Sequence, residues 1–505
     1  MRLAAIYIPA GELTHVFGDD HKGYTLNLGG RNIYDCYNDN EGITQVNTAV
    51  LNENFIEDLW GNEITQISAI VGANGTGKSS VLNIFRGHSF CSFVYENIND
   101  NHHEIIQVTH ETQIINDFIY YSPHLNIEIQ NYVIGNFNDL SKFEMILEDT
   151  DLEQGILPNL LELHDSENIK RWIKFIRTPG IDVSLNEIKL PVFEAIKIKL
   201  NSFDSRFNNT SNEFRPFFEE FNKIRSKERD FLYDEKRKID EELNNSTKSK
   251  YYGNAIDLKL EVVSRVIDKV RNILESSGNK YLKEGEIYNA LTIDSPEFAN
   301  ISTLKEAFYW FLENSFIQYS KQSDKIYFPV EPIKDFIETL LKYLPESDDE
   351  IENWTQFDVS FDQALDIINK YKRFIYSFNE DFSYDRKILL NFRPNKNLSS
   401  GEKSMYDLFS TLHDYQFKLD QGVIEEYNRY SKRTSSNDNY LLLLDEADLG
   451  FHPQWKKRFI KSMIDILPII FPNKKTLLYL VVLSFLILYP LTNTQCFWFQ
   501  RYSFR

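Results

Sequence analysis

Cysteine is scarce in this 505-residue sequence, and its scarcity limits the kinds of site that the chain can build. The three cysteines, Cys36, Cys91 and Cys496, lie far apart and form no Cys-x-x-Cys pair. They are too few for a disulfide framework or a structural zinc site. This usage is typical of a reducing compartment, so we expect a cytoplasmic protein.

Basic residues and long apolar runs are also in short supply. The 55 lysines and arginines are outnumbered by 75 aspartates and glutamates, which gives a formal net charge of −20. This balance offers no chain-wide reason to expect nucleic-acid binding, although a local basic surface stays open. The apolar run 477–491 is shorter than the roughly 20 residues of a membrane-spanning helix, and its composition favours a strand. We expect no membrane span and, because Pro9 breaks the first apolar run, no signal peptide.

The order of strand-like and helix-like segments predicts an α/β fold with a helical insertion. Residues 1–135 hold strand-like segments separated by Asn, Asp and Gly turns, whereas 136–379 have mostly helical spacing. Strand character returns in 380–505, with an atypical tail from about residue 475. Within the insertion, the charged run 214–243 holds no sustained heptad, so it predicts a short helical hairpin rather than a long coiled coil.

The stretch GANGTGKSS matches the pattern G-x-x-x-x-G-K-[ST], which is typical of a phosphate-binding loop. Glycines allow the backbone N–H groups to approach phosphate oxygens, and the helix that follows adds its positive N-terminal end. An apolar strand before the loop and a helical segment after it supply the expected context. The alternative is a glycine turn with an incidental Lys-Ser pair. The candidate ligand-binding residues are Gly72, Asn74, Gly75, Gly77, Lys78, Ser79 and Ser80.

Two adjacent acids end the apolar run 440–444, which predicts a central parallel strand covered on both faces. Asp445 and Glu446 would then lie at the carboxyl edge of the sheet, where α/β folds bind ligands. Asp445 can hold Mg²⁺, and Glu446 can polarise an attacking water. The alternative is a solvated acidic turn. His452 follows nearby, but its segment is more typical of a turn before a helix.

The stretch LSSGEK places Ser399, Ser400 and Gly401 just before a predicted helix. By itself it could be a helix N-cap. It could also form a second anion-binding helix end, although the chain already has a loop for phosphates. A second site of this kind is useful if it meets the γ-phosphate of ATP held by another copy of the protein.

Together, GANGTGKS, LSSGEK and LLLLDE resemble the Walker A, signature and Walker B motifs of ABC-type ATPases. Their spelling, with a long insertion, is similar to the SMC- and RecF-like branch. More narrowly, it resembles bacterial AAA-family ATPases related to OLD-family proteins and to anti-phage defence ATPases. The resemblance covers only the motif-bearing ends, and it implies a P-loop NTPase fold of the ABC-type head with ATP and Mg²⁺ as ligands.

The resemblance also implies roles for individual residues. Lys78 and Ser79 match the Walker A lysine and serine, and Ser79 would ligate Mg²⁺ together with Asp445. Glu446 matches the general base. The signature matches, Ser399 and Gly401, would contact γ-phosphate across a homodimer that sandwiches two ATP molecules and opens after hydrolysis. Such a head would switch a partner, for example a separate nuclease or toxin.

One expected feature is missing from the sequence. The family has a switch histidine in a Thr/Ser-His-Ser-Pro turn after the strand that follows Walker B, but no histidine occurs beyond His452. Either that strand, beginning near Thr476, survives without its histidine, or the reading frame changed near Lys475. Both explanations leave ATP binding expected and hydrolysis in doubt, so a hydrolysis-impaired ATP-binding protein is one alternative.

Three rival functions differ from the ATPase head in what they require. An OLD-type nuclease would need a metal-binding TOPRIM domain after the ATPase, and too few residues follow Glu446 for one. The ATP-binding subunit of a transporter would lack the long insertion. A DNA-repair or chromosome-organising ATPase would need a long coiled coil or a basic surface, and neither is evident.

Overall fold

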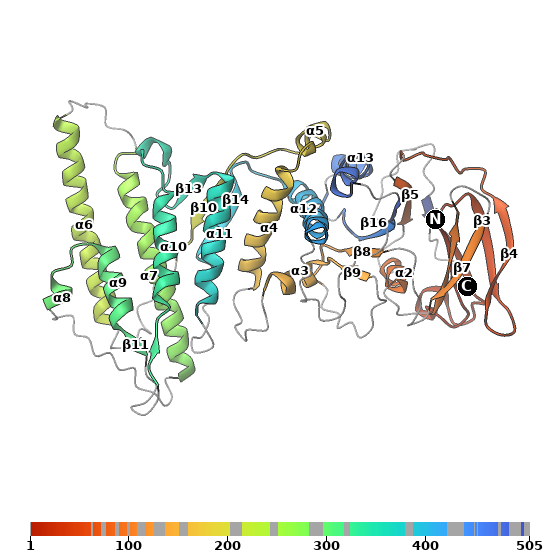
Figure 1. Cartoon of the computed structure of the whole chain (residues 1–505), viewed down its shortest axis with the longest axis horizontal. Coiled ribbons are helices and arrows are strands. Elements are labelled where there is room, and N and C mark those ends of the chain that lie inside the picture. Colours follow the sequence, from red (N-terminus) through yellow and green to blue (C-terminus); the bar gives the residue numbers. More distant parts are fainter. Residues whose placement is uncertain are drawn as a thin grey trace, which may run out of the picture. The chain divides into compact units, whose positions relative to one another are not determined.

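The structure is a computed structural model, and the statements that follow concern the residues that it describes: 2–61, 64–71, 77–85, 90–97, 102–108, 117–125, 137–150, 160–202, 215–242, 251–281, 296–317, 324–378, 387–421, 439–448, 450–451, 453–472, 476–483 and 496–498. The chain forms two compact units. The first unit comprises Met1–Glu148, Arg171–Val192 and Leu398–Arg505. The second unit comprises Asp149–Lys170 and Phe193–Asn397. Both contain helices and strands, which confirms the mixed α/β class (Figure 1).

A six-stranded sheet forms the centre of the first unit, and all of its neighbouring strands are parallel. In spatial order the strands are β17 (Cys496–Trp498), β5 (Ile64–Val71), β16 (Thr476–Leu483), β15 (Asn439–Asp445), β8 (Asp117–Tyr121) and β9 (Phe137–Asp139). Helices α2 (Lys78–Ile84) and α13 (Pro453–Ile470) lie on opposite faces of this sheet (Figure 1). The apolar residues 440–444 of β15 are buried, as expected for a central parallel strand.

The strand expected after the acidic pair is present, as β16. It pairs with β15 on one side and with β5 on the other, so the strand after the acidic pair is present without a following histidine. Residues 484–495 and 499–505 lie outside the described part of the chain, and a frame change near Lys475 stays a hypothesis. Within the described residues, no helix is both long enough and apolar enough to cross a membrane.

A second, antiparallel sheet of the first unit has the strand order β2-β1-β6-β7. Its strands are β1 (Arg2–Ile8), β2 (Tyr24–Asn27), β6 (Cys91–Glu96) and β7 (His103–Val108), and a separate hairpin consists of β3 (Asn32–Asn38) and β4 (Thr44–Leu51). The buried carboxylate of Glu96 joins the hairpin to β6, because it accepts hydrogen bonds from the backbone N–H groups of Arg31 and Asn32 at 2.8 Å. The hydroxyl of Tyr34 donates a third at 3.0 Å.

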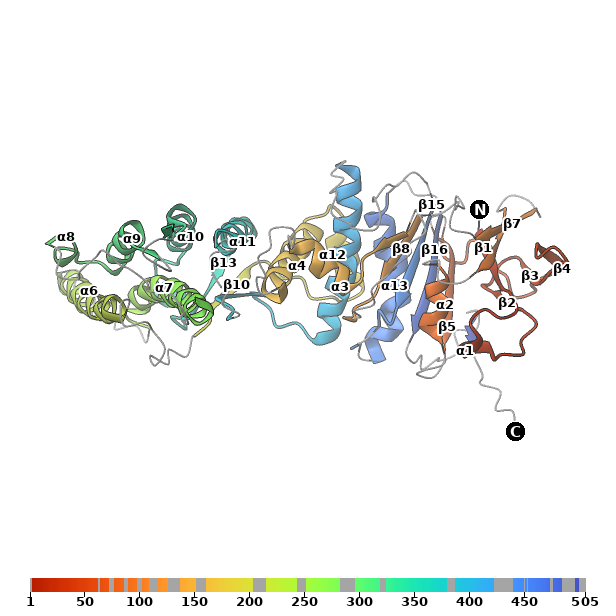
Figure 2. The ribbon, with the colours of Figure 1, turned by 90° about the horizontal axis from the view of Figure 1, so that it is seen from below.

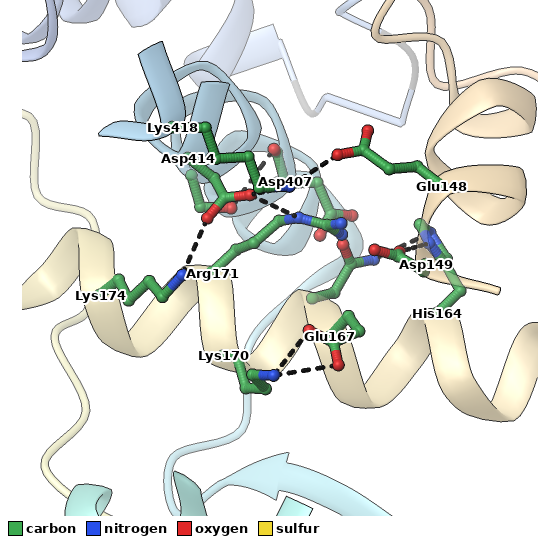
Figure 3. Close-up of polar contacts among 12 residues, drawn as sticks. Glu148, Asp149, His164, Glu167, Lys170, Arg171, Lys174, Asp407, Asp414 and Lys418 are labelled. Atoms are coloured by element: carbon green, nitrogen blue, oxygen red, sulfur yellow. Dashed lines mark hydrogen bonds and ion pairs between the residues drawn. The ribbon is translucent and has the colours of Figure 1, made fainter. Parts of the chain in front are cut away.

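An ion-pair cluster joins three helices of the first unit. Further helices with residues in this unit are α3 (Lys142–Asp149), α4 (Leu160–Ile176), α5 (Ile181–Glu187) and α12 (Ser400–Asp420). Of α4, only the part from Arg171 onward belongs to the first unit. Asp414, which is 3% exposed, pairs with Lys174 at 3.1 Å and with Lys418 at 3.0 Å. Arg171 lies 3.6 Å from the same carboxylate, and Lys418 also pairs with Glu148 (Figure 3). Burial acts to raise the pKa of Asp414, but the three cations outweigh it and hold the pKa well below its usual range.

The second unit is mostly helical. Its further helices are α6 (Arg215–Glu242), α7 (Asn254–Tyr281), α8 (Pro296–Ala299), α9 (Leu304–Asn314), α10 (Val330–Lys342), η3 (Asp348–Glu350) and α11 (Phe361–Tyr376). Its strands form the antiparallel sheet β13 (Gln356–Val359), β10 (Ile196–Leu200) and β14 (Leu390–Pro394) and the pair β11 (Phe316–Ile317) and β12 (Ile326–Tyr327). Helices α6 and α7 pack together, joined by pairs such as Arg229–Asp257 at 2.7 Å, which confirms the helical hairpin (Figure 2).

Candidate functional site

The phosphate-loop motif lies between β5 and α2. Gly77 is the N-cap of α2 and has left-handed backbone angles (φ 87°, ψ 16°), which favour glycine. Lys78 is the first residue of the helix, and it is only 6% exposed. The predicted residues Gly72, Asn74 and Gly75 lie outside the described part of the chain. The described portion of the motif therefore has the strand-then-helix context that the sequence predicted.

A short N-terminal helix, α1 (Thr14–Phe17), lies against the start of α2. A Cβ added to Gly77 would come within 2.5 Å of Val16 Cγ2, so this approach also requires glycine. His15 Nε2 lies 3.1 Å from Ser80 Oγ, within hydrogen-bonding distance. No motif in the sequence connects α1 to the phosphate loop, and the sequence analysis missed both contacts.

Asp445 lies at the end of β15 and meets the beginning of α2. The Ser79 hydroxyl donates a hydrogen bond to Asp445 Oδ1 at 3.1 Å, although the two residues are 366 positions apart. The Tyr120 hydroxyl donates to Asp445 Oδ2 at 3.0 Å. Burial raises the pKa of Asp445, and the hydrogen bonds from Tyr120 and Ser79 oppose part of that rise. The two predicted metal-binding residues therefore lie in direct contact.

Glu446 is the first residue after β15, and its surroundings differ from those of Asp445. Its backbone is in the left-handed region (φ 50°), which is uncommon for any residue except glycine and carries strain. His124, three residues beyond the end of β8, has its Nε2 2.6 Å from Glu446 Oε2. The two side chains are 33% and 26% exposed, so solvent and small ligands can reach both groups.

The signature-like stretch packs on the loop that follows the acidic pair. Ser399 caps α12 in a capping box with Glu402, which confirms the local N-cap interpretation. Gly401 is buried, and a Cβ there would lie 3.4 Å from the carbonyl oxygen of Gly450. Ser399 and Ser400 are exposed to solvent. His452 lies outside the described residues, and α13 begins directly after it at Pro453, as expected for a segment that precedes a helix.

The oxygen atoms of Ser79 and Asp445 suit a magnesium ion. Mg²⁺ takes oxygen ligands, and it usually binds through one or two protein groups while phosphates and water supply the rest. A hydroxyl and a carboxylate in contact provide such a pair. In the part of the chain that the structure describes, no group of three or more His, Cys, Asp or Glu residues could hold a metal alone. A cation at this position would therefore depend on ligands from a bound phosphate and from water.

Two residues of the site, Tyr120 and His124, were missed from the sequence. Both belong to the segment DFIYYSPH, whose strand β8 pairs in parallel with β15 through contacts such as Tyr121 to Leu444. Because the carboxyl ends of parallel strands meet at one edge, the end of β8 is brought beside the acidic pair. The polar ending of this strand was a usable signal, but its neighbour in the sheet could not be read from the sequence.

No family model matches the sequence, and neither the curated proteins nor the solved structures include a significantly similar one.

Proposed function

We propose that this chain is an ATP-binding, Mg²⁺-dependent ATPase with the P-loop fold of an ABC-type head. The observation that carries the proposal is the hydrogen bond between Ser79 and Asp445. It joins a phosphate-loop motif at the start of a helix to an acidic pair at the carboxyl edge of a parallel sheet. Each motif alone has a structural alternative, but a glycine turn and an acidic turn have no reason to meet.

The residues at this edge have distinct roles in the proposed reaction. Lys78 neutralises charge on the β- and γ-phosphates, while Ser79 and Asp445 hold the metal. The bound Mg²⁺ supplies a positive charge that stabilises the phosphate oxygens as negative charge develops. Glu446 accepts a hydrogen bond from the attacking water and orients it toward the γ-phosphate. Asp445 suits the first task because it is buried, and Glu446 suits the second because solvent reaches it.

The working form that we propose is a homodimer that closes around ATP in the cytoplasm. Ser399 and Ser400 are exposed at the beginning of α12, where a second copy can approach them. In the dimer, Ser399 and the N–H group of Gly401 contact the γ-phosphate bound by the other copy. The resemblance to defence-related ATPases extends the proposal to a separate nuclease or toxin that the head switches.

Calorimetry with ATP and Mg²⁺ tests the binding step. Lys78→Ala should weaken ATP binding at least tenfold, because hydrogen bonds to charged groups contribute about 1.5–3 kcal/mol. Lys142→Ala is the matched control, since Lys142 is likewise the first residue of a helix in the first unit but is exposed. Equal affinities of the two variants and the unmodified protein would contradict the assignment of the phosphate loop.

A further inference from the structure

The end of β8 contacts both acids of the candidate site through two side chains. Tyr120, within the strand, donates to Asp445, and His124, just beyond it, lies against Glu446. The register of the two strands explains this second contact. Tyr121 pairs with Leu444. His124 lies three residues after Tyr121, and Glu446 lies two residues after Leu444. The end of β8 therefore contacts both members of the acidic pair.

The contact between His124 and Glu446 has a definite direction. A carboxylate oxygen can only accept, so the imidazole Nε2 carries the proton and donates to Oε2 at 2.6 Å. This hydrogen bond uses one oxygen and leaves the other oxygen of Glu446 available to a water molecule. It also limits the rotation of a side chain whose backbone is already held in a strained conformation.

We infer that His124 is a positioning residue for the general-base carboxylate of Glu446, an inference that rests on the proposed ATPase function. General-base catalysis requires the carboxylate to point at the attacking water, and a misplacement of about 1 Å can cost roughly a hundredfold in rate. A single donated hydrogen bond fixes that direction here. The imidazole comes from the end of β8, and not from the position after β16 where the sequence lacks a histidine.

A purely structural ion pair is the competing explanation for this contact. Ion pairs between partly exposed groups contribute little to stability, and side-chain entropy opposes them. The partner here, Glu446, directly follows β15 and adopts an unfavourable backbone conformation, at the edge that also holds Ser79 and Asp445. A pair that only stabilises the fold has no need to lie at this edge. A pair that orients a catalytic carboxylate must lie there, next to the residues that would hold the metal.

Steady-state ATP hydrolysis and calorimetry on the full chain test the inference. His124→Ala should lower kcat about 10- to 100-fold and leave ATP affinity unchanged, because the base loses its orientation while the phosphate loop is intact. His124→Gln should recover part of the rate, since its amide N–H₂ can replace the Nε2 donor. His103→Gln is the control, because His103 is a partly buried histidine of the same unit whose ring contacts Tyr34 instead.

A double variant separates positioning from a general effect on folding. If His124 acts only through Glu446, then His124→Ala should add nothing to the loss caused by Glu446→Gln. Additive losses, an unchanged kcat, or a kcat that rises in His124→Ala would each overturn the inference. Circular dichroism shows whether the alanine variant folds, and His124→Gln carries the test if it does not. An unmodified protein that neither binds nor hydrolyses ATP would instead refute the proposed function, and the inference with it.

Discussion

Replacing Gly77 by alanine tests how closely α1 covers the phosphate loop. Gly77 combines a left-handed conformation with a close neighbour, since an added Cβ would lie 2.5 Å from Val16 Cγ2 and 2.8 Å from Cγ1. Gly180 provides a matched control. It is the N-cap of α5, another seven-residue helix of the first unit, with φ 84°. Among the described residues, no atom beyond its two chain neighbours lies within 4 Å of its added Cβ.

Both substitutions place alanine in the left-handed region, but only Gly77→Ala also creates a steric overlap. Alanine in the left-handed region costs about 1–2 kcal/mol, and the reduced entropy of the unfolded chain offsets about 0.4–1 kcal/mol of it. Gly180→Ala should therefore destabilise α5 by about 1 kcal/mol. Gly77→Ala adds the overlap with Val16, and overpacking of this kind costs typically about 1–3 kcal/mol. We expect a total of about 2–4 kcal/mol at Gly77.

Amide hydrogen exchange is the suitable assay, because it reports the opening free energy of each helix separately. The Val81 N–H, which donates to the Gly77 carbonyl oxygen at 3.2 Å, should lose more protection in Gly77→Ala than the α5 amides lose in Gly180→Ala. In a Val16→Ala background, the extra loss at Gly77 should disappear. Equal losses at both glycines in the unmodified background would show that Val16 does not lie against the loop, and the reasoning would fail.

Three further predictions concern hydrolysis, dimer formation and the buried ion pairs. Glu446→Gln should accumulate an ATP-bound dimer, because it removes a base whose contribution is typically about 10²–10⁴-fold; light scattering that detects no ATP-dependent dimer would contradict this. Ser399→Arg should block that dimer and leave ATP binding by the monomer intact in calorimetry. Asp414→Asn should destabilise the first unit by about 3–5 kcal/mol at pH 7, because it removes the buried carboxylate that Arg171, Lys174 and Lys418 share. The pKa of Asp414 is lowered on folding, so its contribution is complete above its unfolded pKa of about 4 and is lost as pH falls below it. The difference between the two proteins in urea unfolding should shrink in that range, and a constant difference would refute the assigned charge state.

The strand, the phosphate loop and the helix N-cap of the site could be predicted because each is indicated by residues that are close together in the sequence. An apolar run that ends in two acids indicates a central strand, and a glycine-rich turn before a helix indicates a phosphate loop. Both features depend on residues within about ten positions of each other. The N-cap at Ser399 is equally local, since Glu402 completes its capping box three residues later.

The contacts between distant segments could not be predicted in the same way. His124 reaches Glu446 because β8 is the neighbour of β15, and a sequence does not state the order of strands in a sheet. Val16 reaches Gly77 because α1 folds back on α2, and nothing in either segment marks the other as its partner. In both cases a side chain of ordinary type takes part in the site only through its place in the fold.

The separate environments of Asp445 and Glu446 show how one dipeptide can supply two functions. Asp445 still belongs to β15, so the strand holds its carboxylate in the buried layer, where Ser79 and Tyr120 donate to its two oxygens. Glu446 lies past the last pairing of the strand, and its left-handed backbone turns the chain toward the solvent side of the edge. A carboxylate that is surrounded by donors suits a cation, whereas a carboxylate with one free oxygen and access to water suits proton transfer. The boundary of the strand, which lies between these two residues, is therefore what separates the proposed metal ligand from the proposed base.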